Sequence, residues 1–304
     1  MSGQVNFSEK FKPNFSGHET FPLRQGWLEK SYQAIVNKDE NPFLTESAIA
    51  EFGVGKNMVN SIKHWALATG FIEPFDNKFE PSEYSKLLIG ETLDPYLERT
   101  DTLWKIHYEL VKNPRNMTLH WLFCYFNENV FDKSLVSLRL LEFLKTNELK
   151  SPAHKTLQSD ITVSLATYCQ NKKASTKEDD VGSPLSELKL VRATEDSRFS
   201  FNLGPKTSLS DELLMACIVD YWERENLRLN QTVNTLKFEQ ILHEPRSPGR
   251  IFLLNEKDLS SRLDNIENVS EGGLVWSGTT GIQQLQTTRF YKPELLAKRW
   301  ACIA

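Results

Sequence analysis

Basic and amide side chains recur at helical spacing between Gly53 and Gly70, in the stretch GVGKNMVNSIKHWALATG. The stretch holds no acidic residue, although the whole chain has 40 aspartates and glutamates. Lysine and serine can hold phosphate oxygens, and asparagine can form paired hydrogen bonds with an adenine edge. The residue types therefore predict contact with DNA through Lys56, Asn57, Asn60, Ser61, Lys63 and His64.

A helix over residues 56–68 would position these side chains. Met58, Ile62 and Trp65 fall on one side of such a helix, and the polar residues fall on the other. Gly55 allows a tight turn before the helix, and Gly70 suits the left-handed residue that often ends one. The pattern is also compatible with contact to another protein, or with a plain solvated face.

A second group of polar residues lies in NFSGHETFPLRQGWL, where His18, Glu19 and Arg24 stand among aromatic residues. Imidazole and carboxylate groups can support phosphodiester hydrolysis with Mg²⁺ or Mn²⁺, and Asp101 is the third catalytic candidate. No nuclease signature accompanies them, and a metal site needs several converging ligands. The alternatives are a turn in which His18 and Glu19 satisfy backbone groups, and a polar network at the core edge around Asp101. Arg24 joins the candidate DNA-binding residues.

The elements that must position these residues follow a definite order. Residues 25–36, 45–53 and 56–68 are predicted helices, and FIEPFDNKF predicts two short strands around an Asp-Asn turn. Helix, helix, tight turn, helix and hairpin is the order of a winged helix-turn-helix module. We expect this module within residues 16–95, after an N-terminal arm of residues 1–15.

The remaining sequence predicts a mainly α fold with small β hairpins, of the α+β class. Apolar residues recur at helical spacing through residues 96–180, which indicates a helical domain. The polar stretch 170–184 marks a boundary, and residues 181–304 are expected to form a C-terminal α+β region. Within that region, SPLSELKLVRATEDSRFSFNLG indicates a second winged-helix-like unit, and RIFLL predicts a short strand.

Composition limits the other classes of function. The formal net charge is −4, so any contact with nucleic acid has to rest on a local basic surface. The four cysteines form no CxxC pair, which is typical of buried free thiols in a reducing compartment. Neither a signal peptide nor a bilayer-spanning stretch is evident, and we expect a cytoplasmic protein without membrane contact. The motifs of ATPases, dinucleotide enzymes, serine hydrolases and zincins are absent.

Five blocks of sequence together resemble a bacterial family of uncharacterised domains. They are FSGHETFPLR, GVGKNMVNSIKHWALATG, DPYLERTDTLWKIHYELV, KTLQSDITVSLATY and EDDVGSPLSELKLV, within about residues 14–290. The resemblance is to an SspB-like branch, and it implies a role in DNA phosphorothioation and related defence. It also implies sulfur-transfer and ATPase proteins as partners, and nicking of one DNA strand before sulfur insertion. It assigns no catalytic residue.

Three functions therefore remain open at the level of sequence. The first is a DNA-binding component of a phosphorothioate-modification or defence system, with or without nicking activity of its own. The second is a winged-helix transcriptional regulator that recognises an operator, usually as a dimer. The third is a non-enzymatic adaptor for sulfur-transfer partners.

Overall fold

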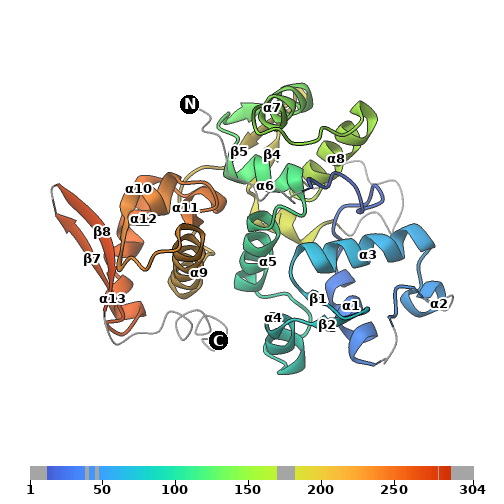
Figure 1. Cartoon of the computed structure of the whole chain (residues 1–304), viewed down its shortest axis with the longest axis horizontal. Helices are drawn as coiled ribbons and strands as arrows, with labels where there is room; N and C mark the ends of the chain where they lie inside the picture. The colour runs from blue at the N-terminus through green and yellow to red at the C-terminus, as the bar shows by residue number, and fades with distance from the viewer. Residues whose placement is uncertain (1–11, 38–40, 45–47, 170–181, 280, 289–304) are drawn as a thin grey trace. The chain divides into compact units, whose positions relative to one another are not determined.

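The chain forms two units, each with its own hydrophobic core (Figure 1). Unit 1 comprises residues 1–98 and 109–202, and unit 2 comprises residues 99–108 and 203–304. The computed structural model describes residues 12–37, 41–44, 48–169, 182–279 and 281–288. The fold is α+β with small antiparallel sheets, which confirms the predicted class.

The first part of unit 1 contains three helices followed by a hairpin and a further helical turn. These elements are α1 (Trp27–Val36), α2 (Ala48–Phe52), α3 (Lys56–Ala68), β1 (Ile72–Phe75), β2 (Lys78–Pro81), α4 (Glu83–Ser85) and the π-helical turn η1 (Lys86–Gly90). The helix predicted over residues 56–68 is confirmed at both ends, and so is the hairpin after it. Ser82 begins α4 by accepting a hydrogen bond from the Ser85 backbone N–H.

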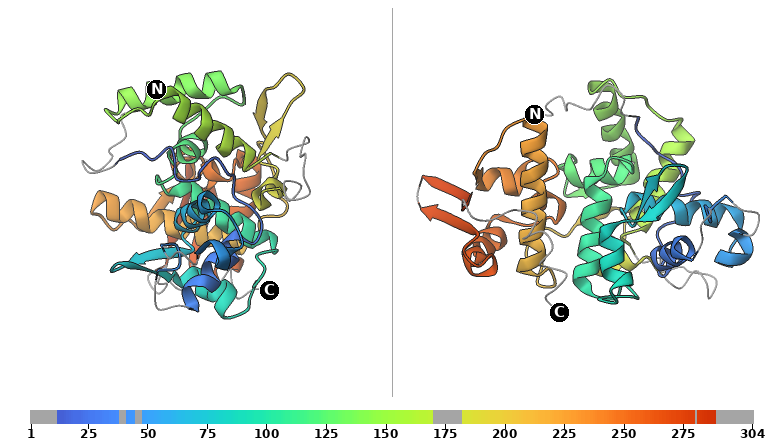
Figure 2. Two further views of the ribbon diagram at one scale, coloured as in Figure 1. Left: turned by 90° about the vertical axis from the view of Figure 1, so that its right-hand side faces the viewer. Right: turned by 60° about the horizontal axis from the view of Figure 1, so that its bottom comes forward.

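The second part of unit 1 contains three helices and a three-stranded sheet. These elements are α6 (Met117–Cys124), β3 (Val130–Phe131), α7 (Lys133–Thr146), α8 (His154–Ala166), the 3₁₀ helix η2 (Pro184–Leu188), β4 (Val191–Ala193) and β5 (Phe199–Phe201). The β4–β5 hairpin is yellow in the left view of Figure 2. The last strand, β5, lies at the centre of the sheet, between β3 and β4. Phe123, Phe131 and Phe201 pack their rings together in the core beside it.

Unit 2 repeats this order of strands. It contains α9 (Asp211–Leu229), β6 (Thr235–Lys237), α10 (Phe238–His243), α11 (Pro248–Ile251), α12 (Glu256–Leu263), α13 (Ile266–Val269), β7 (Leu274–Thr279) and β8 (Ile282–Thr287). Its last strand, β8, again lies at the centre, between β6 and β7. The helix α5 (Thr100–Lys112) contributes its first nine residues to unit 2 and the rest to unit 1.

The two units do not follow the expected division into a helical domain of residues 96–180 and a C-terminal region of residues 181–304. The β4–β5 hairpin pairs with β3, and this pairing places residues up to Asn202 in unit 1. Residues 1–11 of the expected arm, and residues 170–181 of the expected boundary, lie outside the described residues.

One predicted strand is wrong. Residues 250–254 (RIFLL) form the end of α11 and the turn after it, because Ser247 and Pro248 begin a helix there. The Ser247 side chain accepts a hydrogen bond from the Arg250 backbone N–H. Cys124 and Cys217 are buried free thiols, as predicted, whereas Cys169 is a free thiol that is half-buried. Cys302 lies outside the described residues. None of the described helices is long and apolar enough to cross a lipid bilayer.

Candidate nucleic-acid interface

The helix α3 presents a polar edge to solvent near its N-terminus. Lys56 and Asn57 are exposed, while Asn60 and Lys63 are half-buried. Lys56, Asn60 and Lys63 follow one another at intervals of four and three residues, so they share one edge of the helix. No acidic residue lies on α3, and neither lysine pairs with a carboxylate among the described residues. This edge can therefore approach an anion without displacing an existing ion pair.

Two of the predicted contact residues do not reach solvent. Ser61 is fully buried and His64 is 8% exposed, so the expectation that the whole polar face points outward is wrong for them. The segment 14–24 covers them. Ser61 Oγ donates a hydrogen bond to the His18 carbonyl oxygen (2.9 Å), and Trp65 Nε1 donates one to the Phe21 carbonyl oxygen (3.0 Å).

Gly17 allows this segment to pass directly over His64. A Cβ atom on Gly17 would lie 2.7 Å from Nδ1 of His64, and the φ angle of Gly17 is +107°. Glu19 and Thr20 also have positive φ angles, 48° and 68°, which are unfavourable for residues with side chains. The turn around His18 is therefore strained, and its backbone is fixed by the contacts to α3.

His18 lies at the centre of a buried polar cluster. Its Nε2 lies 2.8 Å from Oδ1 of Asp160 on α8, and both side chains are at least 95% buried. The Thr20 backbone N–H donates to its Nδ1 (3.1 Å), which places the ring proton on Nε2, directed at the carboxylate. The contact joins positions 142 residues apart in the sequence.

His64 completes this cluster. Its ring meets the ring of His18 edge-on, with centroids 5.8 Å apart. Burial, and to a lesser degree the charges of His18 and Arg115, lowers the pKa of His64 to about 3. His64 Nε2 and Asp160 Oδ2 are both buried without a hydrogen-bond partner among the described residues. A neutral His64 is thus part of the folded state at physiological pH.

The geometry does not support a catalytic role for His18. Both ring nitrogens are already engaged, and the side chain is 4% exposed, so it cannot accept a proton from a substrate in this arrangement. Glu19 is exposed on the strained turn. Asp101 belongs to unit 2, where its Oδ1 accepts a hydrogen bond from the Ser210 backbone N–H (3.1 Å). No group of three or more His, Cys, Asp or Glu side chains in the described part of the chain could hold a metal ion. His18, Glu19 and Asp101 therefore do not fit a Mg²⁺ or Mn²⁺ site.

Arg24 lies outside the α3 edge. Its guanidinium carbon is 5.5 Å from the centre of the Phe21 ring and 5.7 Å from that of Trp27. Arginine stacked on aromatic faces is held in place by cation–π attraction. The contact with the two aromatic rings is sufficient to explain the position of Arg24, so no DNA contact is needed to explain it.

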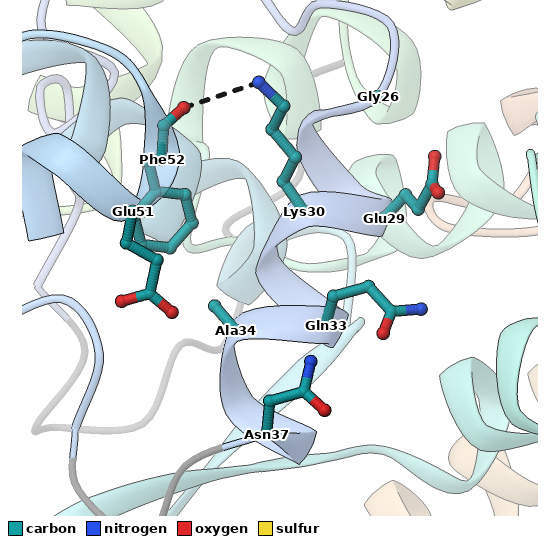
Figure 3. Close-up of a pocket in the computed structure, with 8 residues that line it drawn as sticks. All are labelled: Gly26, Glu29, Lys30, Gln33, Ala34, Asn37, Glu51 and Phe52. Carbon is teal, nitrogen blue, oxygen red and sulfur yellow. Dashed lines mark hydrogen bonds between the residues drawn. The ribbon is translucent and has the colours of Figure 1, made fainter.

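The hairpin and the groove beside α1 are less suited to phosphate. The hairpin exposes Glu73, Asp76 and Glu80. The groove, of about 350 Å³, is lined by two carboxylates, those of Glu29 and Glu51 (Figure 3). Figure 3 shows the amino group of Lys30 reaching across it to the Phe52 carbonyl oxygen, 3.4 Å away. The exposed edge of α3 is therefore the better candidate interface for an anionic polymer.

Asp160 is the residue of the site that sequence reasoning missed. It lies on the buried side of α8, between Leu157 and Ile161. A lone carboxylate on the apolar side of a helix is a signal for a buried partner. The sequence offers no means of identifying that partner as His18.

The fold and the site together define an α+β protein that buries a histidine–aspartate pair behind a candidate DNA-contacting helix. The chain belongs to the protein family of unknown function DUF4007, which matches residues 15–300. Two solved structures have a similar fold, a magnesium ion-bound SspB and a second SspB structure. Each has a TM-score of 0.78 and 23% sequence identity to this chain.

The first alignment covers 94% of this chain and 93% of that chain, and the second covers 95% and 94%. At this identity the likeness establishes the fold, including both units. No curated protein matches the sequence significantly.

Proposed function

We propose that this chain is the DNA-binding component of a DNA phosphorothioate-modification or defence system. Residues 16–95 act in this proposal as a winged helix-turn-helix module, with α3 as the helix that enters the groove. The observation that carries the proposal is the exposed, acid-free edge of α3 formed by Lys56, Asn57, Asn60 and Lys63. The SspB-like fold over nearly the whole chain supports the assignment to a phosphorothioate system.

The two lysines hold phosphates in this proposal, and the two asparagines face base edges or sugars. Phosphate contacts position a protein on the duplex without reading sequence, whereas an asparagine at a base edge can distinguish adenine. The net charge of −4 opposes general attraction to DNA. Binding therefore depends strongly on the few lysines of this edge.

Binding of a short DNA duplex, measured by fluorescence anisotropy, tests the proposal. The double variant Lys56→Glu/Lys63→Glu is expected to bind at least about tenfold more weakly, because two phosphate contacts are lost. The variant Lys189→Glu/Lys257→Glu is the matched control, since it changes two exposed lysines and the net charge equally. Wild-type protein that does not bind, or an α3 variant that binds as tightly as the control, would refute DNA binding through α3.

Nicking of one strand is the second part of the proposal, and it is supported by the family resemblance alone. The assay incubates supercoiled plasmid with the protein in the presence of Mg²⁺ or Mn²⁺. Conversion to open circle is expected under conditions in which DNA is bound. If the plasmid stays supercoiled while binding persists, the chemistry belongs to a partner, and the chain binds DNA only.

A second candidate function, that of an adaptor, is favoured by the β1–β2 hairpin. Phe75 is 55% exposed there, beside the carboxylates of Glu73 and Asp76. Exposed aromatic residues are enriched in protein-binding surfaces, and the neighbouring carboxylates repel DNA phosphates. If Lys56→Glu/Lys63→Glu leaves DNA retention intact but abolishes capture of the sulfur-transfer partner, the adaptor function replaces DNA binding. A transcriptional regulator would instead select one sequence from a random pool, normally as a dimer.

A further inference from the structure

A second helix of unit 1 also presents an edge without acids. On α8, His154 and Lys155 are exposed, as is Thr162 one to two turns further along. The acid of this helix, Asp160, is buried against His18. Lys150 lies exposed in the turn before α8, and neither it nor Lys155 pairs with a carboxylate among the described residues. The exposed carboxylate of this turn is that of Glu148.

The position of α8 in its sheet motif matches that of α3. In residues 117–202 the described order is α-helix, strand, two α-helices, the 3₁₀ helix η2 and a hairpin, with residues 170–181 outside the described part, and the first strand pairs with the last. This is the topology of a winged helix, in which the helix before the hairpin is the one that enters the DNA groove. Here α8 is the last described α-helix before the hairpin, with only the 3₁₀ helix η2 described between them, and α3 is the last α-helix before the β1–β2 hairpin. In this interpretation the second winged-helix-like unit begins at α6, well before the residues in which the sequence indicates it.

A buried contact joins the two helices. The segment 14–24 lies between α3 and α8 (Figure 1). Within it, His18 contacts both helices. Its carbonyl oxygen accepts from Ser61 on α3, while its Nε2 donates to Asp160 on α8. Both hydrogen bonds are buried, and the one to Asp160 is also strengthened by the charge of the carboxylate. These two contacts therefore fix the spacing of the two helices.

Unit 2 provides an internal contrast. It has the same strand order, but α12, which is followed before the hairpin only by the four-residue helix α13, carries Glu256 and Asp258 in its first turn. Arg262 of this helix is already paired with Asp211 and Asp258. The topology alone therefore does not produce an acid-free edge, and the charge pattern of α8 is specific to that helix.

We propose that α8 is a second DNA-contacting helix, which holds backbone phosphates through Lys150 and Lys155. This inference rests on the proposed function, since it assumes that the chain binds DNA. The His18–Asp160 pair then sets the distance between two contacts on one duplex. The contact made by α8 is with phosphates rather than bases, since Lys155 is the charged residue on its exposed edge and Asp160 is buried.

The test measures duplex binding as a function of salt for Lys150→Gln/Lys155→Gln and for Lys56→Gln/Lys63→Gln. Each pair is expected to lower the slope of log affinity against log salt by about 1.8, because two phosphate contacts are lost. A hydroxyl-radical footprint of the α8 variant is expected to lose protection at one end of the site while keeping the rest. Lys189→Gln/Lys257→Gln is the control and is expected to keep the wild-type slope and footprint.

The outcomes separate this inference from the proposed function. If the α3 variant loses slope while the α8 variant keeps the wild-type slope and footprint, α8 does not contact DNA and the proposed function stands. If wild-type protein does not bind duplex DNA at all, both fail. Far-ultraviolet circular dichroism checks that each variant is folded. This is the expected result, because Lys56, Lys150 and Lys155 are exposed and Lys63 is half-buried.

Discussion

Breaking the His18–Asp160 contact is expected to destabilise unit 1 measurably. The Nε2–Oδ1 distance is 2.8 Å, and the exposed fractions of the two side chains are 5% and 1%. Replacing Asp160 with alanine leaves the His18 N–H buried without an acceptor. Leaving a buried hydrogen-bond donor without an acceptor costs about 1–3 kcal/mol of unfolding free energy. We expect Asp160→Ala to fall in that range.

A graded series separates charge from hydrogen bonding. Asp160→Asn keeps an oxygen that can accept from His18 Nε2 but removes the charge, so we expect it to cost roughly 1 kcal/mol. The double variant His18→Ala/Asp160→Ala is expected to cost less than the two single variants together, with a coupling of about 1–3 kcal/mol. Ser159→Ala, at a half-buried neighbouring position on α8, is the control and should change stability by less than about 0.5 kcal/mol.

Urea unfolding followed by circular dichroism measures these differences. The reasoning would be refuted by an Asp160→Ala variant within about 1 kcal/mol of wild type, combined with strict additivity in the double variant. That result would mean that water satisfies His18 as well as the carboxylate does. Because the chain has two units, it can unfold in more than one transition, and these free energies refer to the unfolding transition that the variants shift.

Three further outcomes follow from the same site and its surroundings. The pKa of His64 is about 3 in the folded state, against an ordinary value of 6.5. The contribution of neutral His64 to stability is therefore complete above pH 6.5 and is lost as the pH falls toward 3, by up to about 1.4 kcal/mol per pH unit. In His64→Gln the unfolding free energy should depend less steeply on pH in this range. Gly17→Ala should lower the unfolding free energy, measured by urea unfolding, by about 1–3 kcal/mol. The new Cβ atom would lie too close to His64, and a φ angle of +107° is unfavourable for alanine. Asp132→Ala should cost about 1 kcal/mol, because Asp132 accepts from the Leu135 backbone N–H at the start of α7, and a change below about 0.3 kcal/mol in the thermal midpoint analysis would contradict this.

The limits of α3 could be predicted because local signals determine them. Gly55 precedes the helix in an extended conformation, and Gly70 follows it at φ +69°. The apolar side, with Val59, Ile62 and Trp65, is buried as its spacing indicates. Such features depend on residues within a turn or two of one another, so periodicity and glycine placement are sufficient to find them.

The burial of Ser61 and His64 could not be predicted in the same way. It depends on the segment 14–24, which lies more than 35 residues away in sequence and covers one half of the polar side. The spacing of polar residues along a helix does not show whether they face solvent or the polar backbone of a distant segment. For the same reason Asp160 remained without a partner, because its contact with His18 spans 142 residues.

The strands of the small sheets also depend on distant pairing. β3 has two residues, and it is a strand because β5 lies beside it. β6 has three residues, and it is a strand because β8, which comes much later in the sequence, lies beside it. Isolated segments of this kind have little preference of their own, and tertiary context decides their conformation.

The salt dependence of DNA binding by Lys56→Gln/Lys63→Gln tests the central claim most directly. The claim is that the exposed edge of α3 holds phosphates, and the neutral glutamines remove two cations without adding repulsion. The slope of log affinity against log salt should fall by about 1.8, so that the affinity gap between wild type and variant narrows about tenfold between 50 and 200 mM salt. A variant with the wild-type slope, equal to that of the Lys189→Gln/Lys257→Gln control, would contradict the claim.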